Sequence, residues 1–332
     1  MMIKGQGFAF SSRPFTRLRG LQMILTAGEK RTRTLPAKII SCTFLVFFLV
    51  AGVSPARKNV KDLLGREMVI PDNPRRIVAL APSVTEIIYA LGQEHRLVGV
   101  TQFSDYPEAA RHLPQVGSYV QLDLKRIVAL RPDLCIAIKD GNPKAVIDRL
   151  ASLGIPVYAV DPRDLETVMQ TIIAIGNILD AEQKASRIVN DIQQRVDAVK
   201  VTAAKAQSRP RVFLQIGISP IVSVGSPTFI HQLIEMAGGE NLAAGPVSYP
   251  RFSREQVLGM APEVIIITSM ERSTVFEEVK AEWARWTQLP AVRDHRIFLV
   301  DSNLFDRPTP RLVEGLEMLA KLIHPELFKE GK

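Results

Sequence analysis

Residues 180–207 read Asp-Ala-Glu-Gln-Lys-Ala-Ser-Arg-Ile-Val-Asn-Asp-Ile-Gln-Gln-Arg-Val-Asp-Ala-Val-Lys-Val-Thr-Ala-Ala-Lys-Ala-Gln, with no Gly or Pro. This stretch predicts one long helix, with Asp180 as the N-cap and Gln183 as its capping-box partner. At 1.5 Å per residue it would span about 42 Å, roughly the width of a domain. Apolar residues recur along one face at helical spacing, at Ile188, Ile192, Val196 and Val199.

The chain on either side of this helix alternates apolar strands with predicted helices. Such alternation is typical of parallel sheets, so we expect an α/β fold of two Rossmann-like lobes with mostly parallel sheets, joined by a single long α-helix. The predicted parts are a signal peptide at 1–56, an N-terminal α/β lobe at 57–163, a helical backbone linker at 164–209, and a C-terminal α/β lobe with a closing helix at 210–332.

An internal repeat relates the two lobes. Residues 125–136 match residues 255–266 at a constant offset of 130, and each copy holds a short predicted helix, a Pro followed by an acid, and an apolar strand. The repeat predicts pseudo-twofold symmetry between the lobes. We therefore expect the functional site to lie in the cleft between them. Because a helix without glycine resists bending, we expect this cleft to open and close only modestly.

The first 56 residues have the order of a secretory signal peptide. They carry a net charge of +7, an apolar run at 39–53 and the small residues Ser54, Pro55 and Ala56. The run is shorter than the roughly 20 residues that a membrane span needs, although an uncleaved anchor stays open, as does a start at Met1 or Met23. Because Cys42 does not close the apolar run, we expect no lipoprotein cleavage site.

The rest of the chain is almost neutral, with 34 basic and 33 acidic residues. This balance argues against an electrostatic nucleic-acid binder. A mature chain would keep only Cys135, which lies in the apolar run 134–138. One thiol cannot form an intramolecular disulfide, and we expect Cys135 to be a buried strand residue.

Sequence motifs for catalysis are absent. The chain has no P-loop, no dinucleotide-binding G-x-G-x-x-G after a strand, no H-E-x-x-H and no G-x-S-x-G. Its five histidines are scattered, with no pair at metal-ligand spacing. We therefore predict a binding protein that is not an enzyme and holds no metal or cofactor of its own; a secreted enzyme or metallochaperone is the alternative.

A candidate ligand contact lies where the first predicted strand, 76–81, meets its helix. Ser83 is predicted as the N-cap of that helix and Glu86 as its capping-box partner. A helix N-terminus at the end of a strand directs free amide groups into a cleft. Ser83 is therefore a candidate ligand-binding residue.

Five motifs resemble a known family: residues 76–86, Ser-Asp-Tyr-Pro at 104–107, residues 129–134, Ala-Gly-Gly-Glu-Asn at 237–241, and residues 253–258. They are similar to the helical-backbone (class III) substrate-binding proteins of ABC importers over about residues 74–325, most of all to members that bind cobalamin. The resemblance implies a monomeric periplasmic receptor that delivers a corrinoid to the importer's permease and ATPase. Haem and ferric-siderophore receptors share the scaffold, so they remain the alternative.

The resemblance also implies which residues contact the ligand. It puts aromatic rings in the cleft at Phe103, Tyr119 and Tyr249, and flat rings suit the large faces of a corrin. Asn303 stands where the family has an acid, and Phe305 and Arg307 belong to the same loop. If the ligand were haem, a Tyr or His such as Tyr119 would ligate iron; for a siderophore, Arg307 should converge with Arg251 and Arg254.

A last expectation concerns the transporter. Members of the family dock on the permease through one exposed Glu on each lobe. Glu255 matches the second-lobe position, but the equivalent position in the first lobe is Lys125, a reversal of charge. Asp123, two residues away, is a candidate substitute.

Overall fold

The computed structural model describes residues 56–268, 275–305 and 307–328, which belong to one compact unit. The predicted signal peptide, except for Ala56, lies outside the described residues. Among the helices that are described, none combines the length and the apolar character needed to cross a bilayer. The predicted limits of the two lobes and of the helical linker stay predictions.

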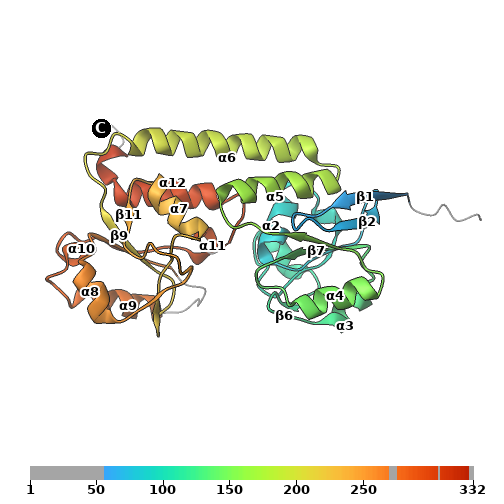
Figure 1. The fold of residues 1–332 in the computed structure, drawn as a ribbon, viewed down its shortest axis with the longest axis horizontal. Coiled ribbons are helices and arrows are strands. Elements are labelled where there is room, and N and C mark those ends of the chain that lie inside the picture. The colour runs from blue at the N-terminus through green and yellow to red at the C-terminus, as the bar shows by residue number, and fades with distance from the viewer. Residues whose placement is uncertain (1–55, 269–274, 306, 329–332) are drawn as a thin grey trace, which may run out of the picture. The chain divides into compact units, whose positions relative to one another are not determined.

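The first lobe is built on a four-stranded parallel sheet (Figure 1). Its strand order is β4 (Leu97–Gly99), β3 (Ile77–Ala79), β7 (Leu134–Ile138) and β8 (Val157–Val160). The helices are α2 (Pro82–Ala90), α3 (Leu124–Ala129) and α4 (Lys144–Ser152), with the 3-10 turns η1 (Glu94–Arg96) and η2 (Glu108–His112). Two antiparallel hairpins complete it, β1 (Arg57–Lys61) with β2 (Glu67–Pro71) and β5 (Gly117–Ser118) with β6 (Gln121–Leu122).

The second lobe repeats this plan. Its parallel sheet has the order β11 (Glu240–Asn241), β9 (Arg211–Gln215), β13 (Val264–Ile267) and β14 (Ile297–Leu299). A short antiparallel pair joins β10 (Ile221–Val222) to β12 (Arg251–Phe252). The helices are α7 (Phe229–Met236), α8 (Arg254–Met260), α9 (Val275–Ala284), α10 (Pro290–Arg293), α11 (Ser302–Phe305) and α12 (Leu312–Ile323), followed by the 3-10 turn η3 (Pro325–Leu327).

The internal repeat is confirmed down to single hydrogen bonds. Arg131 and Ala261, 130 residues apart, both have φ of 46° and so end α3 and α8 in the same left-handed way. Arg76 donates to the two carbonyls that directly follow α3, those of Leu130 and Arg131. Arg211 donates to the equivalent carbonyls at the end of α8, those of Met260 and Ala261. The acid after each Pro then accepts from the backbone N–H of that arginine. Each lobe therefore contains the same set of arginine and carboxylate hydrogen bonds at the end of its repeated helix.

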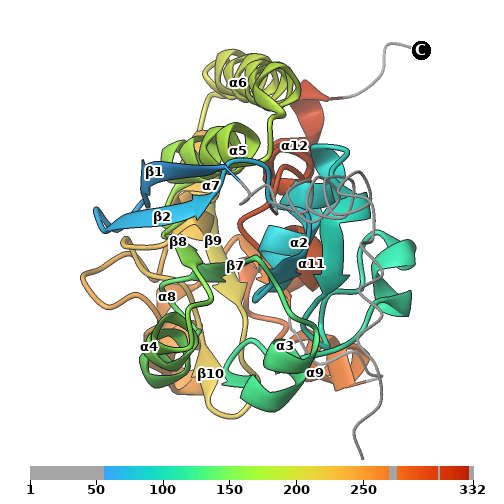
Figure 2. The ribbon, with the colours of Figure 1, turned by 90° about the vertical axis from the view of Figure 1, so that its right-hand side faces the viewer.

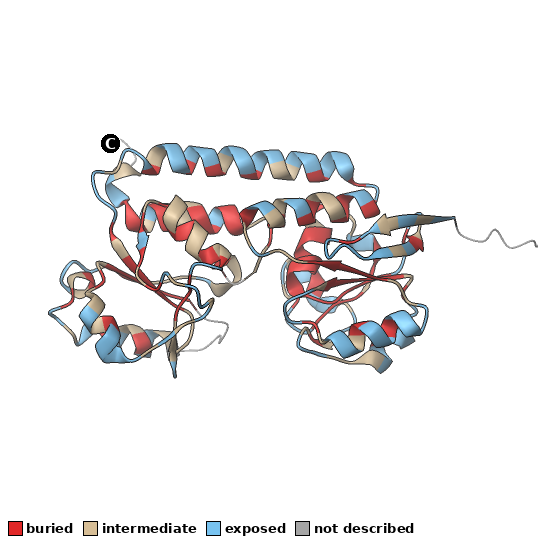
Figure 3. Ribbon diagram, in the orientation of Figure 1, coloured by how far each residue is buried: buried red, intermediate tan, exposed pale blue. Residues whose placement is uncertain are grey.

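Alternation along the strands divides the first lobe's core into two layers. Ile77 and Ala79 of β3 face the cluster that includes α2 and α5 (Leu165–Ile178), whereas Val78 and Leu80 face α3 and α4. All four are fully buried, and Figure 3 shows buried residues along the strands and on the inner faces of the helices. Burial on both faces explains why these strands are continuously apolar.

The long helix is present but shorter than predicted. Helix α6 (Glu182–Ala203) has 22 residues and spans about 33 Å; its inward face includes the predicted Ile192, Val196 and Val199, all buried. It lies over α5 and α12 (Figures 1 and 2). A Cβ on Gly176 of α5 would lie 2.5 Å from the Cβ of Ala185, so glycine permits the close approach of α5 and α6.

The predicted start of this helix was wrong. Asp180 has φ of 58° and precedes the helix, and the N-cap is Ala181, which makes no side-chain capping bond. The Asp180 carboxylate instead lies 3.8 Å from Lys58 and 3.7 Å from Arg96. A capping box with Gln183 is therefore not formed, because the turn between α5 and α6 directs the acid toward the first lobe.

The predicted capping box of α2 was also wrong. The helix begins two residues earlier, with Ala81 as the N-cap and Pro82 in the first turn, a position that suits proline. Ser83 therefore lies inside the first turn, and Glu86 is too far along the helix to reach the N-cap. Both are buried.

Candidate functional site

A pocket of about 870 Å³ lies between the two lobes. The first lobe contributes residues that follow the carboxyl ends of β3, β7 and β8, and the second contributes the starts of α7 and α11. Ligands of open parallel sheets bind at this edge of the sheet, where loops and helix N-termini meet. Of the residues predicted to bind the ligand, six line the pocket: Ser83, Phe103, Tyr119, Tyr249, Asn303 and Arg307.

The three predicted rings reach the pocket from both lobes. Phe103 keeps 48% of its surface exposed and Tyr249 keeps 56%, whereas Tyr119 is half-buried. Exposed aromatic rings are costly in water, and a ligand that covers them gains apolar burial. The arrangement suits a large ligand with flat or apolar faces.

The loop that carries Tyr119 is fixed by a residue that the sequence did not single out. Asn142 donates from Nδ2 to the carbonyls of Leu80 and Tyr119, both at 2.8 Å, and its Oδ1 accepts from the backbone N–H of Ile138 at 2.8 Å. Beside it, Gly141 has φ of +121°, and a Cβ there would lie 2.7 Å from the Tyr119 ring. Since these residues directly follow strand β7, their position was the signal that could have identified them.

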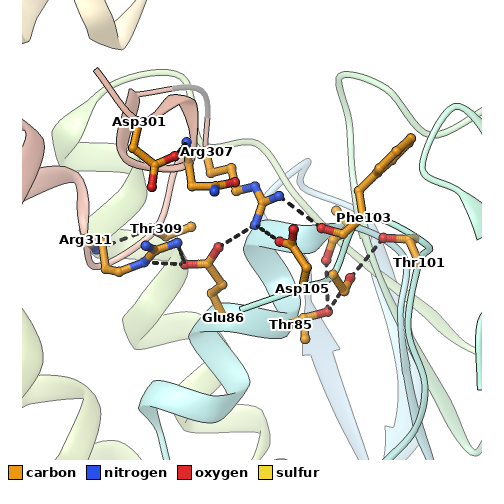
Figure 4. A network of polar contacts seen from close by, with 12 residues as sticks. Thr85, Glu86, Thr101, Phe103, Asp105, Asp301, Arg307, Thr309 and Arg311 are labelled. Carbon is orange, nitrogen blue, oxygen red and sulfur yellow. Dashed lines mark hydrogen bonds and ion pairs between the residues drawn. The ribbon is translucent and has the colours of Figure 1, made fainter. Parts of the chain in front are cut away.

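Arg307 is held at the pocket wall by polar contacts with the first lobe (Figure 4). Its guanidinium pairs with Glu86 and with Asp105, each at 2.9 Å, and donates to the carbonyl of Phe103 at 3.0 Å. Arg311 binds the second oxygen of Glu86 at 2.8 Å. Burial raises the pKa of Glu86, although both arginines act to lower it.

Carboxylates that the sequence analysis missed also line the pocket. Asp140, Asp161 and Asp164 follow β7 and β8, together with Arg163. Asp161 pairs with Lys139 at 3.0 Å and with Arg163 at 3.3 Å. Among the described residues, two arginines line the pocket, Arg163 and Arg307, and each is paired with carboxylates of the protein.

Phe305 is a correction to the predicted site. It is fully buried in the hydrophobic core and does not line the pocket. A Cβ on Gly315 of α12 would lie 3.3 Å from its ring, so the ring packs against α12 where glycine leaves room. The one-turn helix α11 thus directs Asn303 to the pocket and Phe305 to the core.

The candidate docking residues lie at the starts of α3 and α8. Glu255 and Lys125 are exposed, whereas Asp123 is half-buried and caps α3 by accepting from the N–H of Arg126, with which it also pairs at 3.3 Å. The backbone N–H of Glu255 itself and the Ser253 hydroxyl lower the pKa of Glu255. Asp123 therefore already uses its carboxylate to bind Arg126 of α3.

Neither a siderophore-type arginine cluster nor a protein metal centre is found among the described residues. Arg254 pairs with Glu282 on α9 at 2.6 Å, and Arg251 is exposed on β12; only Arg307 of the three candidate arginines lines the pocket. Within the same residues no group of three or more His, Cys, Asp or Glu side chains could hold a metal ion.

Comparison with known proteins agrees with this architecture. A family model described as "Periplasmic binding protein" matches residues 77–304. The vitamin B12-binding protein of Yersinia pestis is 30% identical over 272 residues, which cover 81% of this chain and 94% of that protein.

Two solved structures are similar in fold and sequence. The periplasmic vitamin B12 binding protein BtuF of Vibrio cholerae has a TM-score of 0.68 and 29% identity, covering 78% of this chain and all of that one. A periplasmic heme binding protein from Pseudomonas aeruginosa has a TM-score of 0.69 and 29% identity, covering 76% and 93%.

Proposed function

Because the chain belongs to the periplasmic binding protein family, we propose that it captures a corrinoid, cobalamin or a close relative, in the pocket between its lobes. The family consists of binding proteins, and we infer that this chain likewise releases its ligand unaltered. A volume of about 870 Å³ is near the upper end of the range for ligand pockets, roughly 300–1,000 Å³. A large ligand with extended faces fits such a space.

The observation that carries the proposal is the charge of the pocket. Arg163 is already paired with Asp161, and Arg307 with Glu86 and Asp105, while Asp140 and Asp164 add negative charge to the wall. A ligand rich in carboxylates would meet repulsion here, and burying an unpaired charge is costly. Amide groups like those on the rim of cobalamin are neutral, and their N–H groups can donate to carboxylates.

Haem is the second candidate, because one specific feature favours it. The Tyr119 and Tyr249 side chains both line the pocket, and a tyrosine oxygen is a known axial ligand of haem iron. The similarity to the Pseudomonas heme binding protein also supports this alternative. A ferric siderophore is less well supported, because the candidate arginines do not converge.

The partners follow from the family. We propose that an ABC importer, a permease with its ATPase, receives the ligand, and that Glu255 and Lys125 take part in docking as exposed charges on α8 and α3. Export to the periplasm by the predicted signal peptide and a monomeric state belong to the same proposal. The periplasmic relatives support the location.

Calorimetric titration of the purified protein with cyanocobalamin, haem and a ferric siderophore tests the proposed function. We expect saturable binding of cyanocobalamin with one site per chain and much weaker binding of the two anionic ligands. Haem bound with a shifted Soret band that Tyr119→Phe abolishes would establish the second candidate. Absence of cyanocobalamin binding at micromolar concentration would refute the first.

A further inference from the structure

A buried carboxylate joins the two lobes beside the pocket. Glu86 lies on α2 of the first lobe and is 4% exposed, whereas its partners Arg307 and Arg311 belong to the second lobe. One Glu86 oxygen binds Arg307 at 2.9 Å and the other binds Arg311 at 2.8 Å. In Figure 4 the guanidinium groups of Arg307 and Arg311 both reach the carboxylate of Glu86.

The first lobe completes this arrangement with the loop that carries Phe103. Asp105 of this loop also pairs with Arg307 at 2.9 Å, and Arg311 lies 3.6 Å from the centre of the Tyr106 ring. Two arginines therefore face two carboxylates and one aromatic face. Because the four charges balance, all can be largely buried without an uncompensated ion.

The loop itself is anchored to α2 by buried hydroxyl groups. Ser104 is joined to both Thr85 and Thr101 through hydrogen bonds of 3.0 Å. Since Thr85 is the neighbour of Glu86 in α2, the helix, the loop and residues 307–311 share one polar network. Its residues are called the interlobe clamp below: Glu86, Asp105, Arg307 and Arg311.

The clamp is directly connected to the pocket surface. Arg307 lines the pocket and donates to the carbonyl of Phe103, whose ring also lines it. Ser83, one turn before Glu86 on α2, is a third pocket residue. Glu86 itself does not line the pocket, so it can influence a ligand only through these neighbours.

We propose that Glu86 is a positioning residue for the pocket: it fixes Arg307 and the Phe103 loop against each other, so that the walls contributed by the two lobes keep one spacing. A ligand then meets a preformed site and does not have to order these groups, which lowers the cost of binding. The inference rests on the proposed function only for the choice of ligand.

The substitution Glu86→Gln tests this inference, because it keeps the size of the side chain but removes the charge that holds both arginines. We expect faster hydrogen–deuterium exchange of backbone amides in residues 101–106 and 307–311, and an affinity for cyanocobalamin about tenfold lower, as for the loss of one charged hydrogen bond. Should this variant fail to fold, Arg311→Gln removes one side of the clamp and leaves the pair of Glu86 with Arg307 in place.

The matched control is Glu317→Gln. Glu317 forms a two-point ion pair with Arg195, at 2.8 and 2.7 Å, which joins α12 to α6 away from the pocket. We expect Glu317→Gln to change the free energy of unfolding but to leave the affinity for cyanocobalamin and the hydrogen–deuterium exchange of residues 101–106 unchanged. This difference separates a positioning role of Glu86 from a general structural role.

Each outcome decides the inference. If the Glu86→Gln protein binds cyanocobalamin as tightly as the wild type, or if exchange of these segments is unchanged, Glu86 is not a positioning residue. If the wild type itself fails to bind cyanocobalamin, the proposed function is refuted, and the exchange measurement alone then decides whether Glu86 fixes the clamp.

Discussion

Phe103 offers the most direct measure of how the pocket holds its ligand. The substitution Phe103→Ala removes the ring but keeps the backbone carbonyl that accepts from Arg307. The ring keeps 48% of its surface exposed, which corresponds to about 100 Å² for a side chain of about 200 Å². At about 25 cal/mol per Å², a ligand that covers half of this area gains about 1.3 kcal/mol, and one that covers all of it gains about 2.5 kcal/mol.

These free energies predict a rise in the Kd for cyanocobalamin of about tenfold to about seventyfold, measured by calorimetry. Leu153→Ala is the matched control, because Leu153 has a similar exposed fraction, 46%, and lies at the end of α4 outside the pocket. We expect this control to bind like the wild type. A Phe103→Ala protein whose Kd lies within twofold of the wild type, with an unchanged control, would refute the assignment of this ring to the binding surface.

Three further predictions concern groups around the pocket and in the core. Burial raises the pKa of Glu86 above its ordinary 4.5, so the contribution of Glu86 to folding stability falls as pH rises through that raised pKa. The hydrogen bond from Arg195 lowers the pKa of Glu317, so the contribution of Glu317 to folding stability is lost as pH falls through that lowered pKa. Glu86→Gln and Glu317→Gln should therefore remove pH slopes of opposite sign from the melting temperature, and slopes of equal sign would contradict this. Burial raises the pKa of Cys135 to about 12, so a thiol reagent at pH 8 should label Cys135 only after unfolding; rapid labelling of Cys135 in the native protein would be inconsistent with burial. Gly141→Ala adds a Cβ against Tyr119 at a positive φ and should cost about 1–3 kcal/mol of stability and weaken cyanocobalamin binding, with denaturant titration and calorimetry as the measurements; an unaffected protein would argue against this backbone conformation.

Local patterns in the sequence predicted what local physics determines. The apolar spacing of Ile192, Val196 and Val199 identified the buried face of α6, and the repeat with offset 130 identified the equivalent helices and strands of the two lobes. Fold class followed from the alternation of strands with helices. The aromatic residues of the pocket followed from resemblance, and their role in binding stays a prediction.

The wrong predictions for Glu86 and Phe305 concern side chains whose contacts are made by residues distant in the sequence. Glu86 was interpreted as a capping partner because Ser83 stands three residues before it, whereas its actual partners lie 221 and 225 residues further along the chain. Phe305 was placed in the pocket with Arg307, but the room that Gly315 leaves directs its ring inward. Neither relation has a spacing that a single sequence displays.

The matching left-handed ends of α3 and α8 have a practical consequence for engineering. Arg131 and Ala261 both occupy a conformation that glycine adopts at little cost but other residues adopt at roughly 1–2 kcal/mol. Each half of the molecule therefore contains one equivalent position at which a change to glycine should raise thermal stability. Introducing glycine in one half and then in both would reveal whether the halves melt as a single cooperative body or in succession.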